Sequence, residues 1–357
     1  MAAGSGELEL GRRADRPFLS IVVTAYRRRQ FLLEAVRSIA AGSADPSSYE
    51  VVVVKDFSDP EVDAELMRIG PRVRLITEDF PRVGGSLARG VREAQGDVIA
   101  FLDDDDRFAP EKVATVLQQF RNSPGLGFFR HAYRAIDAEG APVPSWEEFR
   151  PVPPASRSFL PHADPADGVA WIFRFSPHVN VSTMAIRTEL LRPWLEAMST
   201  ILTSQDCFLF VTALVSGSEV RVVRDRLSDY RVHPSVSHAA IAAGTEDLDL
   251  RDTARSLATA EVISGIAAGR PGHPLAVRFA RAFLLEVRTN VFLLDPTARL
   301  AVRDWLGLAR SAVARRQKYL LVPWLFCLYR WCAPRRAAAS YQRRRARRLR
   351  TAASAGP

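Results

Sequence analysis

Four consecutive aspartates, Asp103 to Asp106, follow an apolar segment in the stretch "GDVIAFLDDDDRFAPEKV". One or two aspartates could cap the helix that the pattern beginning at Pro110 predicts, because a helix N-terminus carries partial positive charge. Four adjacent carboxylates repel one another unless a cation offsets their charge. The tetrad is therefore consistent with two interpretations, a solvated loop that caps a helix and a binding site for a divalent cation.

Two carboxylates at positions i and i+2 of such a turn suit Mg²⁺ or Mn²⁺, since both ions prefer oxygen ligands. A cation bound there could stabilise negative charge on a ligand. A further acidic residue, Asp206, lies near the start of the helical segment "SQDCFLFVTALVSG", where an acidic residue fits the helix dipole.

Apolar and amphipathic segments alternate through the first third of the chain. Strands are predicted at residues 18–26, 49–54, 72–77 and 97–102, and helices at residues 30–42, 59–70, 85–96 and 110–121. This order predicts an α/β fold, with a doubly wound, mostly parallel sheet and helices on both faces. Ligands bind such sheets at the carboxyl ends of the strands, so residues 24–26, residues 55–59 and the tetrad should open on one crevice.

The rest of the chain has other patterns. Residues 141–165 are rich in proline and predict a loop, residues 179–191 predict a strand and then a helix, and residues 220–238 predict a pair of strands. Residues 245–315 have a helical pattern throughout. The sequence has no P-loop, and no Gly-x-Gly-x-x-Gly motif follows the first strand, so it lacks the signature of a Rossmann dinucleotide site.

The composition is that of a globular protein. The 357 residues are 47% hydrophobic and 25% charged, which allows a large core and two domains. The three cysteines, Cys207, Cys327 and Cys332, form no CxxC motif, so a reducing compartment is expected. Residues 1–16 lack the apolar stretch of a secretory signal and are expected to be a disordered polar lead-in.

The net charge of +9 is concentrated at one end of the chain. From residue 305 onward there are 13 Lys and Arg and no Asp or Glu, whereas 36 basic residues face 40 acidic ones before that point. The main body is therefore slightly acidic. This charge distribution argues against nucleic acid as a partner.

The motifs, in their order, resemble the family 2 glycosyltransferases of the A-type fold over residues 17–238. The segments that carry the resemblance are "VVTAY", "VVVVKDFSDPE", "GGSLARGVREAQGDVIAFLDDDD", "SQDCFLF" and "YRVHPSVSH". The sequence departs from the family pattern at Lys55, Gly90 and Gln205, where Asp, Asn and Glu are commoner. The resemblance implies a glycosyltransferase domain at 17–238. The patterns that follow indicate a helical region at 239–317 and an apolar segment with an Arg-rich tail at 318–357.

The resemblance also implies roles for particular residues. Donor binding is expected of Thr24, Ala25, Tyr26, Asp56, Gly84, Ser86, Arg89, Asp103 and Asp104. Metal binding is expected of Asp103, Asp105 and His233, with the register inside the tetrad left open. Asp206 would be the catalytic base, and Asp164, Asp167 and Glu189 are the next candidates. Ordinary alternatives remain, since Asp56 fits a turn, Arg89 a solvated helix face and His233 a surface loop.

The activity that the resemblance implies is the inverting, metal-dependent transfer of a sugar. The donor would be a nucleoside-diphosphate sugar, the cofactor Mn²⁺ or Mg²⁺, and the acceptor a hydroxyl group of a glycan or of a lipid-linked molecule. Two alternatives remain. A sugar-phosphate nucleotidyltransferase would need a Gly-rich signature after the first strand, and a non-catalytic membrane or nucleic-acid adaptor would act through the Arg-rich tail.

Residues 318–334 are apolar and aromatic between basic residues. Only 11 uncharged residues separate Lys318 from Arg330, and about 20 are needed to span a bilayer. Pro323 is expected to interrupt a helix, and residues such as Tyr329 favour membrane interfaces. We therefore expect an in-plane helix on an anionic membrane, at the cytoplasmic, inner face of the cell membrane. The alternative is a core helix with a solvated tail.

Overall fold

The computed structural model describes most of the chain. The described residues are 16–26, 29, 31–70, 72–80, 82–144, 151–160, 162, 166–232, 246–295, 297–313, 321–332 and 336–344. The chain divides into two compact units, and unit 1 consists of Met1–Tyr133, Asn180–Ser199 and Asp225–Asp229. Unit 2 comprises the remaining segments. The chain therefore leaves unit 1 and returns to it twice.

Four parallel strands form the first part of the sheet in unit 1. They are β1 (Leu19–Ala25), β2 (Tyr49–Lys55), β3 (Val73–Thr77) and β4 (Val98–Asp103), and their spatial order is β3-β2-β1-β4. Strands β1, β2 and β4 are buried almost throughout and are rich in β-branched residues, as expected for strands covered on both faces. The predicted α/β fold is confirmed.

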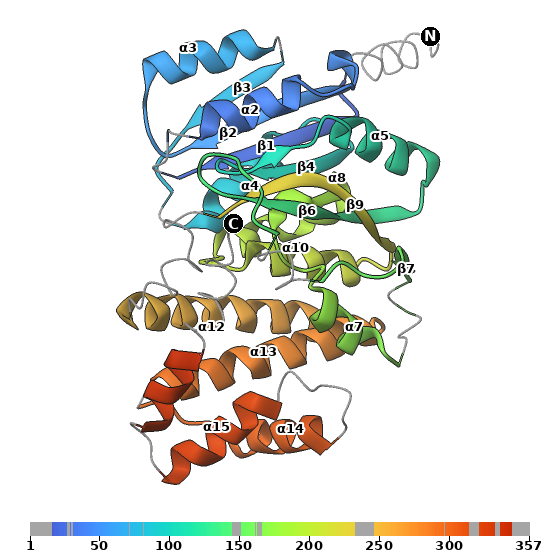
Figure 1. The fold of residues 1–357 in the computed structure, drawn as a ribbon. Helices are drawn as coiled ribbons and strands as arrows, with labels where there is room; N and C mark the ends of the chain where they lie inside the picture. The colour runs from blue at the N-terminus through green and yellow to red at the C-terminus, as the bar shows by residue number, and fades with distance from the viewer. Residues whose placement is uncertain are drawn as a thin grey trace. The chain divides into compact units, whose positions relative to one another are not determined.

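Helices connect these strands. They are α2 (Leu32–Ala40), α3 (Pro60–Ile69), α4 (Val83–Glu93) and, after β4, α5 (Lys112–Asn122). Right-handed connections place α2 and α3 on one face of the strands and α4 on the other (Figure 1). Local sequence sets the limits of α3: the Asp59 side chain accepts a hydrogen bond from the Val62 backbone N–H at 3.2 Å, and the helix ends before Gly70.

Beyond β4 the sheet continues with antiparallel pairs. The further strands are β5 (Arg107–Phe108), β6 (Leu126–Ile136), β7 (Arg157–Phe159), β8 (Met184–Arg187) and β9 (Glu219–Arg231). The sheet order is β3-β2-β1-β4-β8-β6-β9-β5, and β7 pairs with β9. Four short elements also belong to unit 1: η3 (Val181–Thr183), α8 (Thr188–Leu191), η4 (Arg192–Trp194) and α9 (Leu195–Ser199). A further one, η1 (Pro46–Ser48), precedes β2.

The expectation of a strand pair at 220–238 was wrong for its described part, because β9 is one continuous strand. Ser228 and Asp229 look like turn residues in the sequence, but both are buried. They pair with Phe108 and Arg107 of β5, which keeps β9 extended.

Helices form most of unit 2. They are α7 (Gly168–Phe175), α10 (Gln205–Leu214), α12 (Glu246–Ala268), α13 (Pro274–Leu294), α14 (Val302–Val313) and α15 (Leu321–Cys332). The helical pattern of residues 245–315 is confirmed over its described part. An aromatic cluster joins α7, α10 and α13, with ring centroids about 5 to 6 Å apart between Phe173, His178, Phe210 and Phe279.

The described part of the expected membrane segment, Leu321–Cys332, forms helix α15. Pro323 does not interrupt it, because it lies in the first turn, where a missing N–H costs little. One face belongs to a core: Cys327 is fully buried with Leu293 and Leu308. The guanidinium of Arg330 lies 3.9 Å from the centre of the Phe292 ring.

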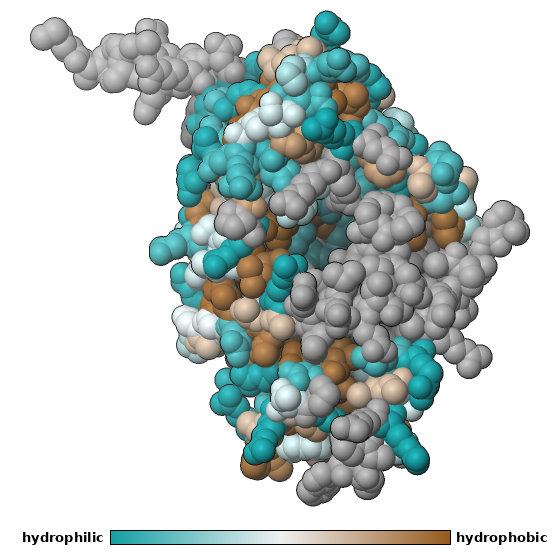
Figure 2. All heavy atoms as spheres, turned by 90° about the vertical axis from the view of Figure 1, so that its left-hand side faces the viewer, coloured by the Kyte–Doolittle hydropathy of each residue, from teal (hydrophilic) through white to brown (hydrophobic). Residues whose placement is uncertain are grey.

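Another part of the α15 surface is exposed and apolar. Leu325, Leu328 and Tyr329, at positions i, i+3 and i+4, are 52%, 36% and 41% exposed. Among the described residues, no helix is both long enough and apolar enough to cross a bilayer. Among the coloured residues in Figure 2, hydrophilic and hydrophobic residues are interspersed.

Candidate active site

The ends of three strands meet at one edge of the sheet in unit 1. In the strand register, Ala25 pairs with Lys55, and Thr24 pairs with Asp103. The carboxyl ends of β1, β2 and β4 are therefore level. This arrangement brings residues 24–26, residues 55–59 and the aspartate tetrad to the same edge, as the strand order in the sequence predicted.

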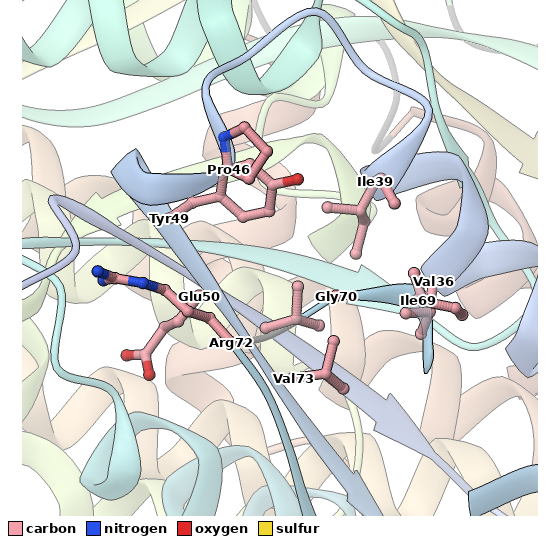
Figure 3. A pocket seen from close by; sticks show the side chains of 11 residues that line it. Val36, Ile39, Pro46, Tyr49, Glu50, Ile69, Gly70, Arg72 and Val73 are labelled. Atoms are coloured by element: carbon pink, nitrogen blue, oxygen red, sulfur yellow. The ribbon is translucent and has the colours of Figure 1, made fainter. Parts of the chain in front are cut away.

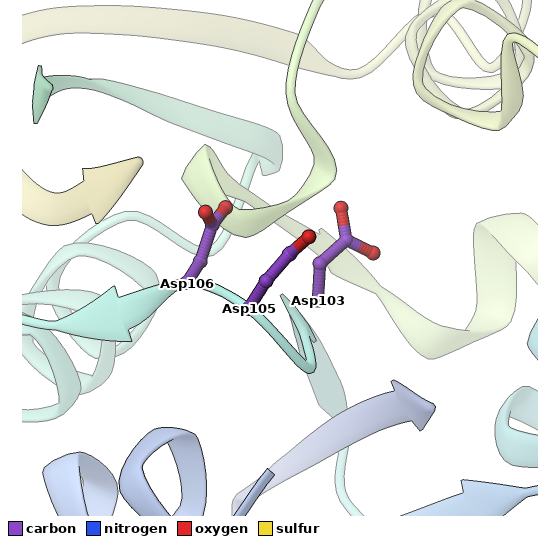
Figure 4. A group of neighbouring side chains, drawn as sticks. All are labelled: Asp103, Asp105 and Asp106. Carbon is purple, nitrogen blue, oxygen red and sulfur yellow. The ribbon is translucent and has the colours of Figure 1, made fainter. Parts of the chain in front are cut away.

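Three aspartates of the tetrad form one group (Figure 4). Carboxylate oxygens of Asp103, Asp105 and Asp106 all lie within 4.8 Å of one another. Asp105 and Asp106 are buried, and Asp103 is partly exposed. A backbone hydrogen bond of 3.2 Å from the Asp106 N–H to the Asp103 carbonyl oxygen closes the turn that carries them.

Asp104 makes a different contact. Its Oδ2 atom accepts a hydrogen bond of 3.3 Å from the backbone N–H of Tyr26, the residue that follows β1. Asp104 therefore ties the tetrad turn to the end of β1. The structure brings Thr24, Tyr26 and the tetrad together, as predicted.

The carboxylate group fits a divalent cation. Three carboxylates within one small volume supply hard oxygen ligands, and their mutual repulsion is relieved when a cation lies between them. Mg²⁺ and Mn²⁺ are the ions that such ligands suit. Sequence analysis assigned Asp103 and Asp105 to the metal, and the structure adds Asp106 to the group.

Two buried basic residues lie in the same unit. Lys112 and His131 are both fully buried. Burial lowers the pKa of Lys112 well below its usual range, and the negative charge of Asp106 opposes that shift. Burial and then the charge of Lys112 lower the pKa of His131, so its imidazole is neutral near pH 7.

Sequence analysis missed Lys112. The available signal was its position on the apolar stripe of α5, with Val113, Val116, Leu117 and Phe120, all of which are buried.

Helix α4 begins near the same edge, because it follows the carboxyl end of β3. Gly84 and Ser86 lie in its first turn, and the Ser86 hydroxyl donates to the Val83 carbonyl oxygen at 2.8 Å. Arg82 occupies the N-cap position and makes no side-chain capping bond. First-turn N–H groups of this kind can bind an anion. The arrangement is compatible with the predicted role of Gly84 and Ser86 in binding a donor.

Two other candidates for donor binding have protein partners. The Arg89 guanidinium pairs with Glu78, at 3.2 Å, and with Glu93. The backbone N–H of Asp56 donates to the Ala25 carbonyl oxygen at 3.3 Å, which fixes the Asp56 backbone beside the end of β1. The roles of Arg89 and Asp56 toward a donor stay predictions.

Lys55, where the family more commonly has Asp, is fully buried. Its ammonium group donates to the Phe57 carbonyl oxygen at 2.6 Å and pairs with Asp63 at 3.0 Å. The ammonium group of Lys55 therefore has one partner in the turn that follows β2 and one in α3.

Asp206 lies in unit 2, in the first turn of α10. Its carboxylate accepts a hydrogen bond of 2.8 Å from the Cys207 backbone N–H. Ser204, just before the helix, has a φ of 55°, an uncommon backbone conformation for a residue other than glycine. The predicted role of Asp206 as a base is compatible with this position and stays a prediction.

The other candidates are less well placed or lie elsewhere. Asp167 pairs with Arg157 at 2.8 Å, and hydrogen bonds from that guanidinium lower the pKa of the carboxyl group, which makes it a weaker base. His233 and Asp164 lie outside the described residues.

A separate pocket of about 120 Å³ lies at the other edge of the sheet (Figure 3). Its walls include Tyr49 and Val73, the first residues of β2 and β3, and Ile39 and Ile69 near the ends of α2 and α3. Because these are the amino ends of the strands, the pocket is not part of the carboxylate site.

Comparison with known proteins shows which family this chain resembles. Residues 20–180 match the sequence profile of "Glycosyl transferase family 2", a range that contains β1 to β4 and the tetrad. This match supports a family 2 glycosyltransferase domain at residues 20–180. The chain is 24% identical over 242 residues to an uncharacterised glycosyltransferase of Nostoc sp., and the match covers 66% of this chain and 71% of the relative.

Two further similarities are informative. A glucosyl-dolichyl phosphate glucuronosyltransferase of Haloferax volcanii is 27% identical over 138 residues, which are 37% of this chain and 41% of that protein. A mannosyltransferase of Pyrobaculum calidifontis, solved with GDP-Man and Mn²⁺, superposes with a TM-score of 0.51 at 17% identity and covers 95% of this chain and 86% of its own. The structural similarity confirms the A-type glycosyltransferase fold.

Proposed function

We propose that this glycosyltransferase is metal-dependent and inverting, and that it transfers a sugar from a nucleoside-diphosphate donor to a hydroxyl group of a glycan or a lipid-linked acceptor. The observation that supports the proposal most directly is the group of three carboxylates at the carboxyl edge of the parallel strands. This edge is where sheets of this kind bind ligands. The Mn²⁺ and GDP-Man in the Pyrobaculum enzyme are consistent with the same chemistry here.

The residues around the tetrad would bind the donor. Thr24, Ala25 and Tyr26 lie at the end of β1, and Asp56 lies beside them. The first turn of α4 would offer backbone N–H groups to a phosphate. Arg89 would contact the donor only by exchanging its pairing with Glu78 and Glu93.

Mn²⁺ or Mg²⁺ would be held by Asp103 and Asp105, with Asp106 as a further carboxylate of the group and His233 as a proposed additional ligand. When bound, the cation would neutralise charge on the diphosphate as it leaves. Asp104 would hold the turn against the end of β1 through the Tyr26 N–H. By binding the cation, the carboxylates would determine where the diphosphate binds.

Asp206 would act as the base. In an inverting transfer, one carboxylate accepts the proton of the acceptor hydroxyl as its oxygen attacks the anomeric carbon. Asp206 lies in the first turn of α10, and its carboxylate accepts a hydrogen bond from the Cys207 backbone N–H.

The nature of the acceptor and the location of the enzyme in the cell are related. The relative from Haloferax volcanii is named for a lipid-linked substrate, glucosyl-dolichyl phosphate. This chain has exposed apolar residues on α15 and 13 basic residues from residue 305 onward, which suit an anionic membrane surface. We therefore propose action at the inner face of the cell membrane, with residues 17–238 as the transferase domain and the rest as a helical and basic attachment region.

A thermal-shift screen with UDP-, GDP-, TDP- and CDP-sugars, each with and without Mn²⁺, tests the proposal. A donor that binds only the folded protein raises the melting temperature, and at a concentration of 100 times Kd it adds about 2.7 kcal/mol of stability. We expect one nucleotide to stabilise the protein in the presence of Mn²⁺ and to lose most of that effect with EDTA. The absence of any shift with every donor would contradict the proposal.

A further inference from the structure

A buried network lies directly beneath the tetrad turn. At its centre is Ser182 of η3, which is fully buried. The Ser182 hydroxyl accepts a hydrogen bond of 3.0 Å from the backbone N–H of Asp103, the first residue of the tetrad. The pairing of β4 with β8 ends at Ala100, so Ser182 supplies an acceptor where the neighbouring strand no longer does.

The other polar atoms of Ser182 are also fixed. Its carbonyl oxygen accepts from Lys112 Nζ at 2.5 Å and from the Ser228 hydroxyl at 2.7 Å. Its backbone N–H donates to Asn180 Oδ1 at 2.8 Å. Lys112 and Ser228 are fully buried like Ser182 itself, so water does not compete for these bonds.

Lys112 is held on several sides. Its ammonium nitrogen lies 3.9 Å from the centre of the Phe108 ring and 3.4 Å from the Ser228 hydroxyl. A buried amine with this many partners has little freedom to move. Through the carbonyl oxygen of Ser182, Lys112 therefore restrains the residue that holds the Asp103 N–H.

We propose that Ser182, anchored by Lys112 and Ser228, is a positioning residue that sets the arrangement of the Asp103, Asp105 and Asp106 carboxylates and thereby the affinity of the site for a divalent cation. The inference rests on the proposed metal-dependent function. Both backbone polar groups of Asp103 are hydrogen-bonded, the N–H to the Ser182 hydroxyl and the carbonyl oxygen to the Asp106 N–H. Residues that orient metal ligands in this way typically change metal affinity by about 10- to 100-fold when they are removed.

The chain supplies a matched control at the other end of β4. Ser20 is fully buried, and its hydroxyl accepts a hydrogen bond of 2.8 Å from the Gly96 backbone N–H, just before β4. Ser20→Ala and Ser182→Ala each remove a buried hydroxyl that accepts from the backbone beside this strand. Both should lower the urea midpoint of unfolding, so a loss of stability does not distinguish a positioning role from a structural one.

The experiment is a titration with Mn²⁺ alone, with free Mn²⁺ followed by its EPR signal. Wild type, Ser182→Ala, Ser20→Ala and Asp105→Ala are compared. We expect Ser182→Ala to raise the Kd for Mn²⁺ by about 10- to 100-fold while Ser20→Ala leaves it unchanged. Equal affinities of wild type and Ser182→Ala, or an equal loss in Ser20→Ala, would overturn the positioning role.

The same titration separates the two proposals. If Asp105→Ala weakens binding but Ser182→Ala does not, the cation site stands and the positioning role fails. If wild type and Asp105→Ala bind Mn²⁺ equally, the cation site fails and the positioning role fails with it. If Ser182→Ala does not fold, the Mn²⁺ titration is carried out with Ser228→Ala instead. A rise in its Kd, smaller than the one expected for Ser182→Ala, supports the inference, and an unchanged Kd overturns it.

Discussion

At the scale of single residues, the four aspartates differ in what their side chains contact. The carboxylates of Asp103, Asp105 and Asp106 lie together, whereas Asp104 accepts a hydrogen bond from the Tyr26 backbone. Identical residue types at adjacent positions thus have different surroundings, because successive side chains of this turn contact different groups. Substitutions within the tetrad should therefore have unequal effects.

Asp105→Ala should weaken the binding of a nucleoside diphosphate in the presence of Mn²⁺ by at least about tenfold, since it removes a proposed metal ligand. Asp104→Ala is the matched control, and it should affect Mn²⁺-dependent binding much less. Calorimetry with UDP or GDP, with and without Mn²⁺, measures both. The metal assignment would be lost if Asp105→Ala bound as tightly as the wild type.

Asp206→Asn should leave donor binding unchanged and lower the rate of transfer by at least about 100-fold, the usual contribution of a positioned base. Asparagine keeps an oxygen that can accept from the Cys207 N–H, so the start of α10 should remain intact. Single-turnover transfer to an accepted substrate measures the effect. Near-normal turnover would direct attention to Glu189, because Asp167 is already paired with Arg157.

At the scale of helices and strands, Gly90 shows how packing explains a departure from the family pattern. A Cβ atom at Gly90 would lie 2.4 Å from Val22 Cγ1 and 3.4 Å from Val54 Cγ2. Helix α4 therefore approaches β1 and β2 too closely for the asparagine that the family more often has. The sequence shows the substitution, but only the distance between α4 and the sheet explains it.

Helix α15 combines a core face with an exposed face, and this changes how its membrane role can be tested. Removing the chain after Gln317 would also remove Cys327 from its buried cluster, and a loss of function would then have two explanations. Tyr341 belongs to the same unit, since its hydroxyl donates to Asn290 Oδ1 at 2.6 Å. A shorter truncation that keeps Tyr341 is the cleaner test.

Ending the chain after Gln342 removes six arginines and keeps Tyr341. Because each basic residue near an anionic leaflet contributes about 1 kcal/mol, an amount that falls as the salt concentration rises, this truncation should move the protein from anionic vesicles into the supernatant. Co-sedimentation at low and high salt measures the shift. Replacing exposed Leu325 and Leu328 with Gln tests the apolar contribution separately. Full-length protein that never sediments would contradict the membrane proposal.

At the scale of the whole molecule, stability should depend on pH through His131. Its pKa in the folded protein lies well below 6.5, so the unfolded chain binds the additional proton as the pH falls through 6.5. Stability from this residue is therefore present above pH 6.5 and declines below it, by about 1.4 kcal/mol per pH unit at most.

His131→Asn should make the free energy of unfolding less dependent on pH between 7 and 5. Asparagine can still donate toward the Ala132 carbonyl oxygen, which His131 Nδ1 contacts at 2.7 Å, but it takes up no proton. Urea unfolding at several pH values gives the slope for both proteins. An identical slope in the variant would show that another group dominates the acid response.

The sequence was sufficient to predict the strands and helices that local residue patterns determine. The buried β-branched runs predicted β1 to β4, and the strand order brought Thr24 and Asp103 to one edge. The sequence did not predict the contacts between residues that are far apart in the chain. Ser182 contacts Asp103 only because β8 pairs with β4, and Lys112 becomes an anchor only because Ser182 and Ser228 surround its ammonium group.

Unit 1 consists of three separate segments of the chain, which the ribosome synthesises one after another. Residues up to Tyr133, including all four parallel strands and the tetrad, leave the ribosome before Asn180–Ser199 and Asp225–Asp229 exist. A nascent chain thus carries the complete aspartate sequence before Ser182 can fix the Asp103 N–H and before Ser228 can fix Ser182. Domains commonly fold as their chain emerges, but this site reaches its final form only after residue 229 is made. A fragment released by an early stop codon would contain the whole motif without the residues that hold it in place.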